Sequence, residues 1–231
     1  MHTSYILLSG GFSKLMRRAL CISLLAVIAA SPALADQTCK SQVDAAFAKL
    51  REQKGFRLET TITNANGKLK MQADYILPDR MHQKVVLGEE GNPMEMIVIG
   101  NNAWSNQGQG WSALPENFAT EVAKQVKETV AQGTNSVSDY ECLGDIELEG
   151  TKYVGFKGIL PTPIDPANEK RGPVISAAKV PNQQSVYVDK ASGLPIRNIV
   201  NPVTEPDKRL FDGRFTVVEG LKIEAPQIKA N

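Results

Sequence analysis

Residues 94–111 read MEMIVIGNNAWSNQGQGW, and the same kind of pattern continues on both sides of them. The stretch holds both Trp residues of the chain and two of its six Met residues. It predicts a strand, a tight turn at Gly100-Asn101-Asn102, a second strand through Trp104, and a Gly-Gln-Gly turn before Trp111. Alternation puts Met94, Met96 and Val98 on one strand face and Ile97 and Ile99 on the other. Either face is compatible with a buried position.

Short strands joined by turns precede this stretch. Apolar residues at alternate positions predict strands over 56–62, 69–77 and 80–87. Asn66-Gly67 is a typical hairpin turn, and Pro78-Asp79 marks the next one. The sequence therefore predicts an antiparallel meander of four or five strands.

Two segments have helical periodicity instead. Apolar residues recur at i, i+3, i+4 and i+7 within 38–52 and again within 115–132. Gly55 and Gly133 suit the ends of these helices, and Pro115 suits a helix start.

More strands are predicted after the second helix, over 140–148, 153–160, 186–189, 196–200 and 209–218. Residues 161–181, rich in Pro and mixed charge, predict a long surface loop. The pattern indicates one α+β domain over residues 36–231, with helices on one face of a curved antiparallel sheet.

The first 35 residues are typical of a cleavable signal peptide. Lys14, Arg17 and Arg18 precede the apolar run 19–30, which is too short to span a bilayer. Ala33-Leu34-Ala35 fits a cleavage site, so we predict cleavage after Ala35 and an exported protein without stable membrane insertion. A membrane anchor is the alternative.

Charge and cysteine content narrow the function further. The chain has 26 Lys and Arg against 25 Asp and Glu, which gives no electrostatic case for nucleic-acid binding. Beyond the leader only Cys39 and Cys142 remain. Export to an oxidising compartment favours a disulfide between them, and two buried thiols are the alternative.

Residues that could support catalysis are few. His82 is the single histidine after the leader, and it has no nucleophile motif beside it. One His and two Cys do not make a usual zinc site, and no phosphate-binding loop or dinucleotide motif is present. Glu89-Glu90 lies in a predicted turn, and alternate carboxylates at Asp145, Glu147 and Glu149 are typical of a solvated strand face. We predict a protein that is not an enzyme and needs no cofactor or metal.

The remaining signal is apolar. Four of the six Met residues, Met71, Met81, Met94 and Met96, fall in the first meander. Met suits surfaces that adapt to varied apolar partners, although filling gaps in an ordinary core is the more common use. A curved sheet with helices on its concave side can also enclose an apolar space.

These features resemble the superfamily of the periplasmic outer-membrane lipoprotein carrier (LolA-like). The resemblance rests on the N-terminal helix followed by a meander, the unit Ile97–Trp104 with a helix after it, and the late element Val188–Arg197 with its Gly-Leu-Pro turn. It implies an open half-barrel, strongly curved and antiparallel, with helices packed on the concave face and an apolar cavity for acyl chains. The residues that we expect to line this cavity are Phe56, Leu58, Met71, Met81, Met94, Met96, Val98, Trp104 and Trp111.

The chain also departs from the family pattern. The carrier has an Arg-Pro pair near the end of its second strand, where the Arg holds the lid closed; here Leu77-Pro78 stands there, and Arg80 is our candidate for the lid contact. The resemblance implies a periplasmic protein that binds lipid or lipoprotein acyl chains. The alternative is a non-enzymatic sensor or interaction module with envelope proteins as partners.

Overall fold

The computed structural model describes residues 38–65, 67–88, 91–131, 137–161 and 180–228. The chain divides into two units, Met1–Ala35 and Asp36–Asn231, and all described residues belong to the second. The predicted signal peptide and most of the predicted loop 161–181 lie outside the described residues.

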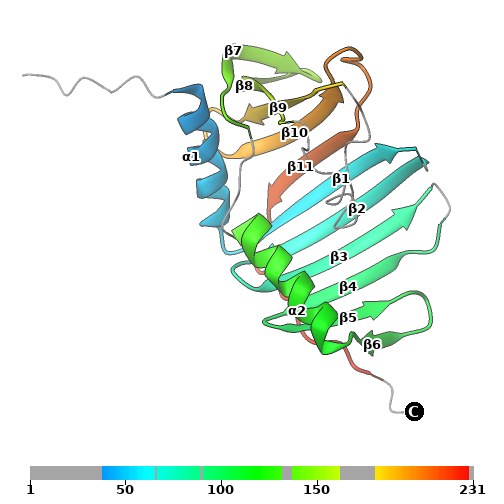
Figure 1. Cartoon of the computed structure of the whole chain (residues 1–231). Helices are drawn as coiled ribbons and strands as arrows, with labels where there is room; N and C mark the ends of the chain where they lie inside the picture. The colour runs from blue at the N-terminus through cyan, green and yellow to red at the C-terminus, as the bar shows by residue number, and fades with distance from the viewer. Residues whose placement is uncertain (1–37, 66, 89–90, 132–136, 162–179, 229–231) are drawn as a thin grey trace, which may run out of the picture. The chain divides into compact units, whose positions relative to one another are not determined.

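All the described strands form one antiparallel sheet (Figure 1). Its order is β6-β5-β4-β3-β2-β1-β11-β10-β9-β8-β7. The bounds are β1 Phe56–Asn64, β2 Gly67–Ile76, β3 Arg80–Leu87, β4 Met94–Ile99, β5 Asn102–Asn106, β6 Trp111–Ala113, β7 Glu141–Leu148, β8 Thr151–Ile159, β9 Asn182–Val188, β10 Pro195–Pro202 and β11 Phe211–Val217.

The sheet is two meanders joined at one seam. Strands β1 to β6 follow one another in sequence, and so do β7 to β11. Phe56 of β1 pairs with Val217, and this β1–β11 ladder connects the two halves. The edges β6 and β7 do not pair, so the sheet stays open. This confirms the predicted fold class, an α+β half-barrel with helices on its concave face.

Two helices accompany the sheet. Helix α1 is Cys39–Arg51, and the Thr38 side chain caps it by accepting a hydrogen bond from the Ser41 backbone N–H at 3.2 Å. Helix α2 is Glu116–Gln125, with Pro115 at its N-cap, and it continues as the π-helix η1, Val126–Ala131. Both predicted helices are therefore present. The predicted end at Gly133 lies outside the described residues.

Strand β9 is longer than the sequence predicts. It begins at Asn182, whereas periodicity places its start at residue 186. The extra residues are polar, and polar residues rarely signal a strand. Here they pair on both sides, since Gln183 lies opposite Asn201 on β10 and Ile159 on β8. Pairing with two neighbouring strands therefore overrides the weak local preference.

Helices and sheet enclose two buried clusters. Their members come from the sheet, from both helices and from the segment 137–140 before β7. The first is Leu50, Phe56, Ala73, Tyr75, Met81, Val98, Ala103, Ala119, Ala123 and Val126, and the second is Val43, Ala46, Val137, Tyr140, Phe156, Val186 and Val188.

Candidate functional site

The strand register shows which side chains face the helices. Tyr75 lies opposite Phe56 on β1 and Met81 on β3. Val98 lies opposite Met81 and Ala103. Directly opposed residues share a face of the sheet. All five belong to the cluster that contains Ala119 and Ala123 of α2, so this is the helix-facing surface. By alternation, Met94 and Met96 also face the helices, and Ile97 and Ile99 face away.

Aromatic contacts stabilise the helix-facing surface at the end of the strands where Phe56 and Tyr75 lie. We call this the closed end. The rings of Phe56 and Tyr75 stack at 5.1 Å between centroids, and Phe47 of α1 meets Phe215 of β11 edge to face at 5.6 Å. Burial raises the pKa of the Tyr75 phenol to about 12. The tyrosine is therefore neutral and acts as a packing residue here.

Burial decreases along the strands from this closed end. On β3, Met81 is 4 % exposed, Val85 is partly buried, and Leu87 is 56 % exposed. On β4, Val98 is fully buried and Met94 is 37 % exposed. We call the partly open end the open strip. Its residues are Leu69, Met71, Val85, Leu87 and Met94.

The other half of the helix-facing surface is more polar. The Tyr140 hydroxyl donates to Gln184 Oε1 at 2.8 Å, and Gln184 Nε2 donates to Asn198 Oδ1 at 3.0 Å. This chain of hydrogen bonds crosses β9 and β10. Within the described residues, the apolar and partly open surface therefore lies on β2, β3 and β4.

The nine residues predicted to line a cavity are divided between two faces. Phe56, Leu58, Met71, Met81, Met94, Met96 and Val98 face the helices. Trp104 lies opposite Ile97, and Trp111 lies opposite Asn106, so both face the other way. The structure thus brings together seven of the nine and separates the two Trp residues from them.

Trp111 lies near the only histidine of the described residues. The His82 and Trp111 rings are 6.2 Å apart between centroids, and His82 Nε2 lies 2.9 Å from Glu95 Oε2. Across the described residues, no group of three His, Cys, Asp or Glu side chains could hold a metal ion.

Arg80 contacts the C-terminal segment. Its Nη1 donates to the carbonyl of Ile223 at 2.9 Å. Ile223 is buried. The lid contact that the sequence suggests for Arg80 stays a prediction, because the hydrogen bond in this structure fastens residues 221–228 rather than a helix.

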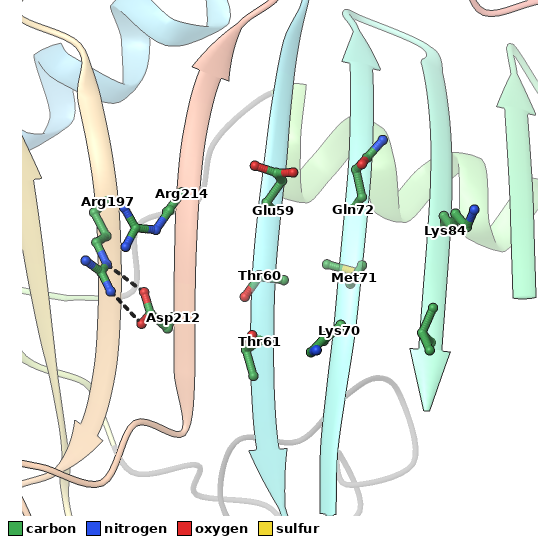
Figure 2. Close-up of a pocket in the computed structure, with 11 residues that line it drawn as sticks. Glu59, Thr60, Thr61, Lys70, Met71, Gln72, Lys84, Arg197, Asp212 and Arg214 are labelled. Carbon is green, nitrogen blue, oxygen red and sulfur yellow. Dashed lines mark hydrogen bonds and ion pairs between the residues drawn. The ribbon is translucent and has the colours of Figure 1, made fainter. Parts of the chain in front are cut away.

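The face away from the helices carries a polar groove of about 460 Å³. It crosses β3, β2, β1, β11 and β10 (Figure 2). We call it the outer groove. Nine of its lining residues face away from the helices, namely Glu59, Thr61, Lys70, Gln72, Lys84, Val86, Arg197, Asp212 and Arg214. Thr60 and Met71, which alternation places on the helix-facing side, also border it.

A charge network closes one end of the outer groove. Arg197, only 4 % exposed, donates from Nε and Nη2 to the Asp212 carboxylate at 2.7 and 2.8 Å. Its Nη1 lies 2.7 Å from Glu149, which also accepts from Arg214 at 2.6 Å. Burial acts to raise the pKa of Asp212, but the hydrogen bonds from Arg197 outweigh it and keep that pKa below its usual value. The network is fully ionised at neutral pH.

The sequence did not reveal this network. Alternation identified Asp145, Glu147 and Glu149 as a solvated face, yet Glu149 lies in the β7–β8 turn and reaches arginines of β10 and β11. The backbone of Glu149 has a φ of 53°, which is uncommon for a residue other than glycine. Sequence alone gives no sign of that backbone angle.

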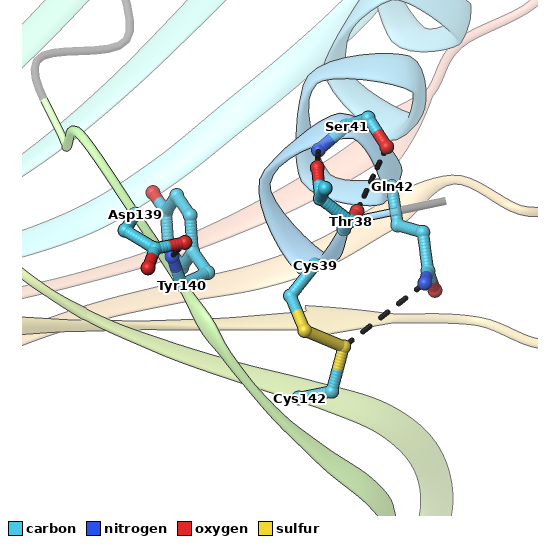
Figure 3. Close-up of a disulfide and its surroundings, with 7 residues drawn as sticks. All are labelled: Thr38, Cys39, Ser41, Gln42, Asp139, Tyr140 and Cys142. Carbon is cyan, nitrogen blue, oxygen red and sulfur yellow. Dashed lines mark hydrogen bonds between the residues drawn. A yellow bond between two sulfur atoms is a disulfide. The ribbon is translucent and has the colours of Figure 1, made fainter. Parts of the chain in front are cut away.

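The predicted disulfide is present (Figure 3). Cys39 and Cys142 are bonded, with their Cα atoms 5.3 Å apart. The bond ties the first residue of α1 to β7. It agrees with an oxidising compartment. None of the helices in the described part of the chain combines the length and the apolarity that a bilayer crossing requires.

Solved structures share this architecture. No family profile matches the chain, and neither does any curated protein sequence. The lipoprotein LppX of Mycobacterium tuberculosis aligns over 80 % of this chain and 97 % of its own, with a TM-score of 0.53 and 12 % identity. LprF of Mycobacterium bovis aligns over 81 % and 96 %, with a TM-score of 0.50 and 11 % identity.

A LolA superfamily protein of Nitrosomonas europaea aligns over 78 % of this chain and 92 % of its own, with a TM-score of 0.32 and 11 % identity. Identities this low concern the fold and not the function. The described unit therefore shares the fold of LppX and LprF, an open antiparallel half-barrel with helices on its concave face.

Proposed function

We propose that this chain is a periplasmic carrier that holds lipid or lipoprotein acyl chains without covalent bonds. The observation that supports this most directly is the open strip. Leu87 and Met94 expose large apolar side chains on the face where such residues are otherwise buried by helices. A surface of this kind is where an apolar ligand gains most by leaving water.

The open strip continues into the buried cluster, which suits an elongated ligand. Met71 lies next to Ala73 along the same face of β2, and Met94 is followed there by Met96 and Val98. Methionine side chains adapt their shape, so one surface can accept chains of different length and saturation. In this proposal Phe56, Met81 and Val98 become accessible to the ligand when the helices move, as lids do in other binding proteins.

The energy available is sufficient for binding. Burial of apolar surface contributes about 25 cal/mol per Å². One acyl chain therefore gains several kcal/mol, enough to compete with the cost of ordering it. The disulfide and the predicted signal peptide support the periplasm as the compartment.

Native mass spectrometry of the protein purified from a periplasmic extract tests the proposal. We expect a bound lipid that delipidation removes, and we expect added long-chain phospholipid or lipopeptide to raise the melting temperature of the delipidated protein. A protein that carries no lipid, and whose melting temperature is unchanged by these additions, would contradict a carrier function.

A further inference from the structure

The proposed binding of acyl chains does not account for the outer groove, because this groove faces away from the helices and from the open strip. Its lining combines four cationic side chains, Lys70, Lys84, Arg197 and Arg214, with two carboxylates, Glu59 and Asp212. The groove therefore carries a positive excess. A charged surface of this kind does not favour the binding of an apolar ligand.

The cations differ in how far they are already neutralised. Arg197 and Asp212 satisfy one another, and Arg209 adds a further contact to Asp212 at 2.7 Å. The side-chain ammonium groups of Lys70 and Lys84 form no hydrogen bond or ion pair with any described residue. Arg214 binds Glu149 through Nη2 and remains half exposed, so it keeps N–H donors for a ligand.

The cations that keep N–H donors for a ligand lie at separate places along the groove. Lys84 is on β3 and Arg214 is on β11, three strand spacings away. Neighbouring strands are about 4.8 Å apart, so the two backbones are separated by roughly 14 Å. Figure 2 shows Thr61 and Gln72 between them, with Glu59 close by. A single phosphate needs cations that converge on one point, which this arrangement does not provide.

We propose that the outer groove binds an extended acidic segment of a partner protein. A separation of roughly 14 Å equals about four residues of extended chain, so acidic side chains at the two ends of such a segment reach Lys84 and Arg214. Thr61 and Gln72 can hydrogen bond to its main chain between those ends. A membrane surface would fit less well, because the groove is recessed and carries two carboxylates of its own.

Fluorescence anisotropy with a labelled Asp/Glu-rich peptide about six residues long tests this proposal. We expect saturable binding at low ionic strength that weakens toward about 0.15 M salt. We expect the double variant K70Q/K84Q to bind about tenfold more weakly. A peptide with Asn and Gln in place of Asp and Glu should not bind.

The matched control is K127Q/K222Q, which removes two exposed lysines outside the groove and should leave binding unchanged. Equal weakening in both double variants would overturn the proposal, since the attraction would then be unspecific. Absence of peptide binding to the unmodified protein at low salt would overturn it as well.

Two further measurements complete the test. Thermal melting followed by circular dichroism checks that the K70Q/K84Q variant folds. If the double variant does not fold, the single variant K84Q is used in its place. Sedimentation with phosphatidylglycerol vesicles distinguishes an anionic membrane surface from an acidic peptide as the ligand of the groove. Vesicle binding that requires Lys70 and Lys84, in a protein that ignores the peptide, would assign the groove to a membrane and overturn the proposal.

Discussion

Glu149 is the residue at which the fold accepts an unfavourable backbone angle. Its φ of 53° is costly for a side chain other than Gly, Asn or Asp. Its carboxylate contacts Arg197 and Arg214, and it lies 4.0 Å from Arg209. The ion pairs offset the backbone cost and hold the β7–β8 turn against β10 and β11.

This explanation predicts the order of three variants in urea unfolding. E149Q keeps the backbone cost and loses the charge, so it should be the least stable. E149G loses the charge but relieves the backbone, so its stability should fall between E149Q and the unmodified protein. E147Q, on an exposed carboxylate of the same hairpin, should be close to neutral. A midpoint for E149G below that of E149Q would show that the backbone angle is not costly.

The same residue predicts a pH dependence. Hydrogen bonds from Arg214 first, and from Arg197 second, lower the pKa of Glu149 from 4.5 to about 2. A carboxyl group with a lowered folded-state pKa stabilises the protein above its unfolded pKa, and this contribution is lost as the pH falls through the folded value. The stability difference between the unmodified protein and E149Q should therefore be complete near pH 6 and vanish toward pH 2. A difference that is constant over this range would contradict the ion-pair explanation.

At the level of elements, the disulfide fastens α1 to the edge strand β7. It joins residues that are 103 positions apart. In the chain-entropy account, closing a loop of that length in the unfolded state stabilises the protein by about 4–5 kcal/mol. The variant C39S/C142S should lose about that much in urea unfolding. The unmodified protein in reducing agent should show the same loss of unfolding free energy as C39S/C142S. A loss below about 1 kcal/mol would contradict the prediction.

The elements also show where sequence patterns suffice. Strand β3 covers the predicted residues 80–87, because its apolar side chains alternate and turns bound it on both sides. Strand β9 starts earlier than predicted, because Asn182 and Gln183 are held by pairing with β8 and β10 and not by their own preference. Local periodicity therefore identifies an element, and its neighbours set its length.

For the whole molecule, alternation sorts side chains within a strand but does not say which strands are neighbours. The outer groove needs Lys84 of β3 and Arg197 of β10 in one place, and only the β1–β11 ladder brings them there. The sequence also could not predict which sheet face Met94 lies on, because Met94 on one face and Ile97 on the other are both apolar. Helix packing decides it, because Val98 belongs to the cluster that contains Ala119 and Ala123.

The proposed carrier function depends on the helix-facing surface as a whole, and the open strip allows a test that leaves the core intact. Leu87 and Met94 are exposed, so L87Q/M94Q should fold normally, yet a ligand chain lying on the strip would lose two apolar contacts. We expect about tenfold weaker binding of a fluorescent long-chain fatty acid, measured by titration of its emission.

The control I159Q/V203Q removes two apolar side chains of similar exposure outside the strip, and it should bind as the unmodified protein does. The variant W104F tests the opposite face. If W104F weakens binding and L87Q/M94Q does not, the ligand lies on the face of Trp104 and Trp111, and the open strip is not its site. If both double variants weaken binding equally, exposed apolar residues attract the probe wherever they lie. Only a loss confined to L87Q/M94Q supports an acyl chain held between sheet and helices.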